Sequence, residues 1–240
     1  MPATVETILG HLAVVENERA ARAASPILLK RVKAIKAYQQ RRFSHTYADL
    51  LATQRYAGAA RFFLDELYGP GDFSQRDAQF VRVVPALVRL FPREVVETVN
   101  TLAQLHALSE TLDSEMGRQL EGDEVTAPIY IAAWQGIGRV AEREMQIALT
   151  LAVGHSLDKL TRKPLLRSTL RMMRGPARAA GLSALQQFLE NGFDTFLAMR
   201  GAQDFLSTVS TREHLLAASL FDKEVLNSGE TRAQALGQLP

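Results

Sequence analysis

Cysteine is absent from all 240 residues of the chain. Disulfide bonds, thiolate nucleophiles and zinc sites with cysteine ligands are therefore excluded. Long apolar runs are missing too, since a run such as 129–134 is far shorter than the ~20 residues that a membrane-spanning helix needs. The first residues lack a basic segment followed by an apolar one, so we expect no signal peptide. These absences are compatible with a soluble protein, and we expect a cytoplasmic location.

Patterns that mark well-known catalytic sites are also absent. The chain has no Gly-x-Ser-x-Gly turn and no His-Glu-x-x-His pair, which excludes two common hydrolase templates. Gly136 and Gly138 form a Gly-x-Gly pair, but they fall inside a predicted helix without the preceding strand of a dinucleotide-binding fold. None of the five histidines stands in a pattern that identifies a haem ligand. We expect no cofactor and favour a binding function, while enzymatic activity stays open.

What the chain does contain is an ordinary globular composition with helical periodicity. Hydrophobic residues make up 47% and charged residues 22%, with a formal net charge of +2. No useful length of sequence alternates as a strand would, and no repeat or low-complexity linker is visible. We predict an all-α protein of about eight or nine helices. Its bundle domain covers 25–226, preceded by an N-terminal helix in 1–24 and followed by a polar tail in 227–240.

Apolar spacing and helix-stop residues set the expected helix limits. The predicted helices cover about 4–24, 26–43, 46–67, 75–90, 93–120, 127–160, 164–174, 177–207 and 210–226. Helix N-termini are predicted at three hydroxyl–acid pairs: Thr46/Asp49, Ser74/Asp77 and Ser210/Glu213. Pro85 predicts a kink or a short break, and Asn191-Gly192 predicts either a turn or a close helix crossing.

Aromatic residues are few, at 7%, yet one nine-residue run is rich in them. This run consists of Phe62, Phe63, Leu64, Asp65, Glu66, Leu67, Tyr68, Gly69 and Pro70. Its phenylalanines lie on the apolar side of a predicted helix, and Gly69 with Pro70 is a typical helix end. The run closely resembles the motif of the bacterial FFLEELY-motif proteins, with Asp65 in place of one glutamate. The resemblance implies an all-helical bacterial protein and no particular activity.

The two acids of this motif lie in the last turn of its helix. Carboxylates there face the negative end of the helix macrodipole, so Asp65 and Glu66 need compensation. The basic residues that could supply it are Arg61, Arg76 and Arg82. We predict that the motif is a structural clamp, with a ligand or partner site on the two acids as the alternative.

One carboxylate falls on the apolar side of the predicted helix 127–160. At about 100° per residue, Glu144 lies among Tyr130, Ile137 and Ile147. A carboxylate there must be paired, protonated or metal-bound, because an isolated buried charge is too costly. A structural pair would need an arginine from a packed helix, such as Arg82 or Arg89.

The helix predicted over 93–120 carries further metal-ligating residue types. His106, Glu110 and Asp113 lie on adjoining turns of one side. Two facing helices with such groups can assemble a carboxylate-bridged metal site, to which Glu144 would contribute. However, no ferritin-type Glu-x-x-His pair is present, and His155 would lie about 16 Å from Glu144 along its helix. A metal site is therefore the alternative, and structural ion pairs are favoured.

Positive charge is concentrated in two segments of the chain. No acidic residue occurs in 19–48 or in 159–178, although both contain several lysines and arginines. Four cations of the second segment share one predicted helix face: Lys163, Arg167, Arg171 and Arg174. Such a face could meet an acidic protein, a lipid headgroup, a small anion or nucleic-acid phosphates. No aromatic residues interleave for base stacking, which makes nucleic acid the weaker alternative.

Together these patterns predict a non-catalytic helical binding or adaptor domain with a protein or anionic partner. One alternative is a metal-carboxylate or small-ligand enzyme built on Glu144 with His106, Glu110 or Asp113. Another is nonspecific nucleic-acid binding by the basic helices. Homodimerisation stays open.

Overall fold

The computed structural model describes residues 3–67, 71, 73–222 and 237–240, whose regular secondary structure is entirely helical. These residues form α1 (Val5–Ala23), α2 (Pro26–Thr46), α3 (Ala48–Ala52), α4 (Ala57–Phe62), the π-helical η1 (Phe63–Leu67), α5 (Ser74–Leu90), α6 (Arg93–Gln119), α7 (Ala127–Ile137), α8 (Val140–Thr161), α9 (Pro164–Met172), α10 (Arg174–Ala179), α11 (Ser183–Ala198) and α12 (Gln203–Phe221). The all-α class is confirmed, but the predicted eight or nine helices are too few. Within this part of the chain, no helix combines the length and apolar character that a membrane crossing requires.

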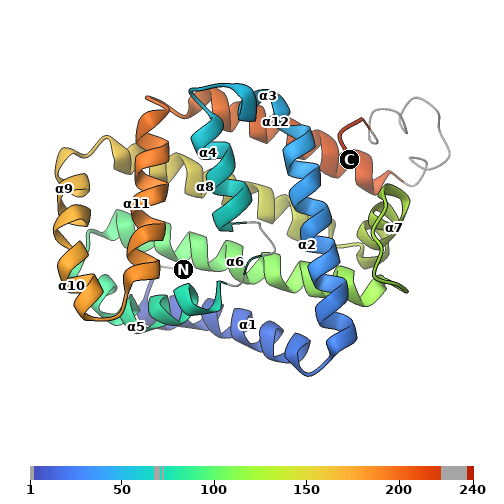
Figure 1. Ribbon diagram of the computed structural model, residues 1–240, viewed down its shortest axis with the longest axis horizontal. Coiled ribbons are helices and arrows are strands. Elements are labelled where there is room, and N and C mark those ends of the chain that lie inside the picture. The colour runs from blue at the N-terminus through green and yellow to red at the C-terminus, as the bar shows by residue number, and fades with distance from the viewer. Residues whose placement is uncertain (1–2, 68–70, 72, 223–236) are drawn as a thin grey trace.

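The helices form two crossed layers (Figure 1). In one layer, α1, α6, α8 and α12 run along the long axis, and α6 packs against both α1 and α8. In the other layer, α2, α4 and α11 cross in front, with α2 packed on α6 and α11 on α8. α7 lies at one end of the molecule, and α9 with α10 lies at the opposite end. The interior between these layers contains the site described below.

The paired phenylalanines of the aromatic motif join two parts of this interior. Phe62 belongs to an apolar cluster with Phe80 and Phe188, whereas Phe63 belongs to a second cluster with Phe205. Their ring centroids are 6.4 Å apart in an edge-to-face arrangement. The prediction that both rings are core residues is confirmed.

The end of the motif is partly as predicted. Arg76 is the predicted partner that reaches back, but it donates to the backbone carbonyl of Glu66, at 2.7 Å, and not to a carboxylate. The Glu66 carboxylate instead accepts a hydrogen bond from Asn191 at 3.3 Å. The motif helix itself is interrupted between α3 and α4 and ends as η1. Tyr68, Gly69 and Pro70 lie outside the described residues, as does most of the predicted tail.

The helix predicted over 127–160 is two helices. Gly138 has φ of 60° and ends α7 in the left-handed conformation, after which α8 begins at Val140. Glycine adopts this conformation without the steric penalty of a Cβ. Because the helical phase is interrupted at Gly138, a face counted from α7 does not continue into α8.

The three predicted N-terminal capping pairs are all wrong. Thr46 is the last residue of α2, and its hydroxyl donates to the carbonyl of Gln238 at 2.9 Å. Ser74 is already inside α5, whose N-cap is Phe73. Ser210 and Glu213 lie in the middle of α12, which begins at Gln203. The pairs at Thr46 and Ser210 thus misplace their helix starts, whereas α5 begins within one residue of its predicted start.

Two expected interruptions do not break their helices. α5 continues through Pro85. α11 continues through Asn191-Gly192, where a Cβ on Gly192 would lie 2.9 Å from Cζ of Phe62. Of the two predicted options at Asn191-Gly192, the close helix crossing is confirmed.

Candidate ligand-binding cavity

Two of the predicted metal-ligand candidates on α6, His106 and Glu110, form ion pairs or hydrogen bonds with side chains of neighbouring helices. His106 Nε2 lies 2.8 Å from Oδ2 of Asp77. Glu110 binds Arg22 at 2.5 Å through one oxygen and Lys36 at 2.6 Å through the other. These pairs connect α6 to α1, α2 and α5.

Asp113 has weaker partners than its neighbour Glu110. It accepts a hydrogen bond from Gln39 at 3.0 Å, while Lys36 Nζ is 3.9 Å away. Burial raises the pKa of Asp113 and outweighs the opposing charge of Lys36. For Glu110, burial acts in the same direction but the charges of Lys36 and Arg22 outweigh it, lowering the pKa to about 2.

These carboxylates do not gather into a metal-binding group. In the described part of the chain, no cluster of three or more histidine or acidic residues is arranged to hold a metal ion. Glu144 is exposed on α8, where its carboxylate lies 3.4 Å from Nε2 of His214. The predicted burial of Glu144 is therefore wrong, and the side chain that occupies the interior is its neighbour Arg143.

The helix break at Gly138 explains why Arg143, and not Glu144, faces the interior. The predicted apolar face was counted along one continuous helix from Tyr130 to beyond Ile147. In α8, however, Val140 and Met145 are exposed, and Arg143 faces the core. The glycine itself was the available signal, because Gly past the last apolar residue is a usual helix end.

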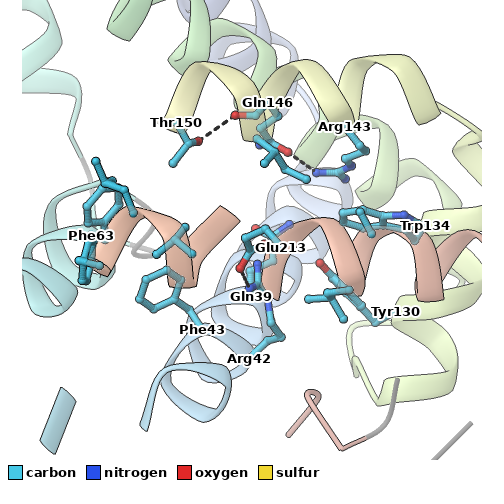
Figure 2. A pocket seen from close by; sticks show the side chains of 16 residues that line it. Gln39, Arg42, Phe43, Phe63, Tyr130, Trp134, Arg143, Gln146, Thr150 and Glu213 are labelled. Atoms are coloured by element: carbon cyan, nitrogen blue, oxygen red, sulfur yellow. Dashed lines mark hydrogen bonds and ion pairs between the residues drawn. The ribbon is translucent and has the colours of Figure 1, made fainter. Parts of the chain in front are cut away.

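A cavity of about 70 Å³ lies between α2, α7, α8, α12 and η1 (Figure 2). Its polar lining comes from four helices and includes Gln39, Arg42, Trp134, Arg143, Gln146 and Glu213. Phe43 and Phe63 line the opposite side of the cavity from Arg143 and Trp134. Arg143 thus lies on the opposite side of the cavity from the two phenylalanine rings, and the Arg42–Glu213 pair also lines it.

Arg143 is buried and has no carboxylate partner among the described residues. It is 2% exposed, and its side chain contacts neutral groups in this part of the chain. Nη1 donates to Oε1 of Gln146 at 2.9 Å, Nη2 contacts Sδ of Met116 at 2.9 Å, and Cζ lies 3.8 Å from the ring centroid of Trp134. Burial lowers the pKa of Arg143, in spite of raising contributions from Tyr130 and Asp113. The guanidinium thus contacts an amide oxygen, a thioether and an aromatic ring face, none of which carries a negative charge.

Arg42 lines the same cavity but is paired. Its Nη1 binds Oε1 of Glu213 at 2.5 Å, and the hydroxyl of Tyr47 donates to the same oxygen at 2.6 Å. Burial and the charge of Glu213 together raise the pKa of Tyr47, which keeps its hydroxyl protonated and able to donate. Arg42 and Glu213 therefore contribute no net charge, and Arg143 leaves the lining with an excess of one positive charge.

Three buried donors at this cavity have no hydrogen-bond partner among the described residues: Nε of Arg42, Nε1 of Trp134 and Nε of Arg143. Nearly all buried polar groups in proteins are hydrogen-bonded, so each exception needs an explanation. All three atoms are enclosed by protein atoms, so a hydrogen-bond acceptor in the cavity reaches them only where neighbouring side chains move.

Comparison with protein families identifies the region that contains this cavity. The family described as Domain of unknown function (DUF8198) matches residues 18–226. The chain belongs to this family. Every residue that lines the cavity lies within the matched range. Searches of curated proteins and of solved structures found no match to the chain.

The basic face predicted on the surface is largely paired within the DUF8198 region. Lys163 binds Glu94, Arg167 lies 2.9 Å from Asp194, and Arg174 lies 2.5 Å from Glu190. Arg171 makes none of the ion pairs found among the described residues. The cations also divide between two helices, since α9 ends at Met172 and α10 begins at Arg174. Little unneutralised charge therefore remains on this face.

Sequence reasoning missed the cavity because its residues come from distant segments. Arg42 belonged to a recognised basic segment, but nothing local distinguished it from its exposed neighbours. Glu213 matched a capping pattern, and the spacing along 127–160 singled out Glu144 instead of its neighbour Arg143. Only the crossing of α2 with α8 and α12 brings these three side chains together.

Proposed function

We propose that this protein is a non-catalytic binding domain for a small anionic molecule, which it holds in the cavity beside Arg143. The observation that carries the proposal is the Arg143 guanidinium, buried beside a cavity without a carboxylate partner. Burying a charge costs several kcal/mol even after relaxation, and proteins usually offset that cost with a paired charge. An anion in the cavity would supply the missing partner.

The surroundings support an anion more than a neutral molecule. A guanidinium forms short, charge-assisted hydrogen bonds with carboxylates and phosphates, about twice as strong as neutral ones. Contact with Trp134 offsets only part of the burial, since a desolvated cation–π interaction contributes about 2 kcal/mol. Asp113 is the carboxylate with the largest electrostatic effect on Arg143, but the described residues show no ion pair between the two side chains.

The exposed basic face gives less support for a protein, lipid or nucleic-acid partner. Three of its four cations are paired within the molecule. The resemblance of the aromatic run to FFLEELY-motif proteins implies no particular activity. It does bear on the site, because Phe63 of that run lines the cavity.

A thermal-shift titration of the full chain with sodium acetate and sodium phosphate tests this function. We expect at least one anion to raise the unfolding temperature of the wild type and to have no effect on Arg143→Gln. Arg139→Gln is the matched control, because Arg139 is an exposed arginine four residues earlier, at the N-cap of α8. Equal anion responses in the wild type and Arg143→Gln would contradict the proposal.

A further inference from the structure

The cavity differs in chemistry from one side to the other. Arg143, Gln146 and Trp134 stand on one side, and the rings of Phe43 and Phe63 stand on the other (Figure 2). Phe205 and Leu206 belong to the same apolar cluster as those rings and also line the cavity, whereas Arg42, next to Phe43, is polar. A ligand that satisfies both sides needs a charged head and an apolar tail.

We propose that the ligand is a short-chain monocarboxylate, with its carboxylate bound by Arg143 and Trp134 and its alkyl chain packed against Phe43 and Phe63. This inference rests on the proposed function and specifies its ligand class. Neither the family nor the predicted basic face indicates such a ligand.

The unsatisfied donors suit a planar head with two oxygens. Nε and Nη2 form one edge of the Arg143 guanidinium; Nε has no partner, and Nη2 contacts only a thioether, which is a weak acceptor. This edge is enclosed in the structure, and once the thioether of Met116 moves aside it can donate two parallel hydrogen bonds to a carboxylate, the geometry for which arginine is well suited. Nε1 of Trp134 is a further unsatisfied donor on the same side.

The charge of the lining and the size of the cavity further restrict the class of ligand. The lining has an excess of one positive charge, which matches a monoanion and leaves a phosphate dianion undercompensated among aromatic rings. The volume of about 70 Å³ is enough for a small molecule, since about 10–15 Å³ measured with a water-sized probe holds one water. A carboxylate with a few methylene groups therefore fits better than a long-chain fatty acid.

Calorimetric titration of the full chain with acetate, butyrate, hexanoate and butyramide tests the head and the tail separately. Each buried methylene strengthens binding about fourfold, so butyrate should bind about fifteenfold more tightly than acetate. Hexanoate should gain nothing further, because the cavity is filled. Butyramide, which has nearly the same shape without the charge, should not bind.

Two variants assign the ends of the ligand. Arg143→Lys keeps the charge but removes the two-donor edge, so we expect it to bind butyrate at least tenfold more weakly than the wild type. Phe43→Leu enlarges the tail side, so we expect it to bind hexanoate more tightly than butyrate. Both variants keep interior side chains of similar character, and circular dichroism checks that they fold.

The outcomes separate this inference from the proposed function. If phosphate binds in an Arg143-dependent way and butyrate does not, the ligand class is wrong and anion binding stands. If butyramide binds as tightly as butyrate, or Arg143→Lys leaves butyrate binding unchanged, the assignment of the head is overturned. If no anion binds the folded wild type, both proposals fail.

Discussion

Arg22 and Arg143 are both buried, but only Arg22 has a carboxylate partner. Arg22 is 5% exposed, binds Glu110 at 2.5 Å and donates to the hydroxyl of Ser114 at 2.9 Å. Arg143 has Gln146, Met116 and a tryptophan ring instead. The cost of burying the charge is thus offset at Arg22 and largely uncompensated at Arg143. Substitution by methionine should therefore change the unfolding free energy in opposite directions at the two positions.

Replacing Arg22 with methionine should destabilise the protein by about 3 kcal/mol. Removing one member of a buried ion pair leaves the other buried without compensation, which typically costs about 3–5 kcal/mol. The lower end applies because Lys36 still binds Glu110. Urea unfolding of Arg22→Met measures the change, and an unaltered midpoint would contradict this account of the pair.

Replacing Arg143 with methionine should stabilise the ligand-free protein by about 1 kcal/mol. Methionine fills the interior without a charge, and replacing buried ionic groups with apolar ones is often stabilising. The lost contact with Trp134 reduces the gain. Urea unfolding without added anions measures the difference. A loss of several kcal/mol would show that the protein itself already compensates the charge.

Asp113 should make stability depend on pH in a defined direction. Its pKa is raised in the folded state above the ordinary 3.8, mainly by burial. The folded protein therefore binds the proton more tightly, and this contribution to stability, complete below pH 3.8, is lost as the pH rises through the raised pKa. In Asp113→Asn this loss should disappear, so the variant should gain stability relative to the wild type as the pH rises. Unfolding free energies across a pH series would contradict this if the difference did not change with pH.

At the scale of helices, Gly138 decides which side of α8 faces the interior. Its positive φ separates α7 from α8. Gly138→Ala should destabilise the protein by about 1 kcal/mol, because a Cβ disfavours the left-handed conformation. Gly10→Ala is the matched control and should stabilise by about 0.5–1 kcal/mol, since Gly10 is inside α1 with open space around its Cα. Equal effects of both substitutions on thermal unfolding would refute this role of Gly138.

The same helices show what the sequence could and could not predict. The limits of α1, α5 and α6 follow closely from apolar spacing and from Pro and Gly near their ends. The motif phenylalanines are buried as periodicity indicated. The break at Gly138 and the start of α12 at Gln203 were missed, because tertiary packing overrides weak local signals there. These two errors account for the misplacement of Glu144 and for the unrecognised role of Glu213.

At the scale of the whole molecule, the crossed layers determine where polar groups are buried. The ion pairs of Asp77 and Glu110 connect α6 to α1, α2 and α5 on one side. On its other side, α6 contacts α8 through the hydrogen bond that Gln146 donates to Ser109 at 2.8 Å. The first group of charges is compensated internally, and the Arg143 cavity is where compensation is incomplete. In the described part of the molecule, the uncompensated positive charge of the interior therefore lies at the Arg143 cavity.

The most direct test of this claim is the unfolding free energy of wild type and Arg143→Met, measured without ligand and with saturating butyrate. A ligand at 100 times its dissociation constant stabilises the folded state by about 2.7 kcal/mol, which exceeds the expected advantage of about 1 kcal/mol for the variant. We predict that the variant is the more stable protein without butyrate and that the wild type is the more stable one with it. The same order of stability under both conditions would contradict the account.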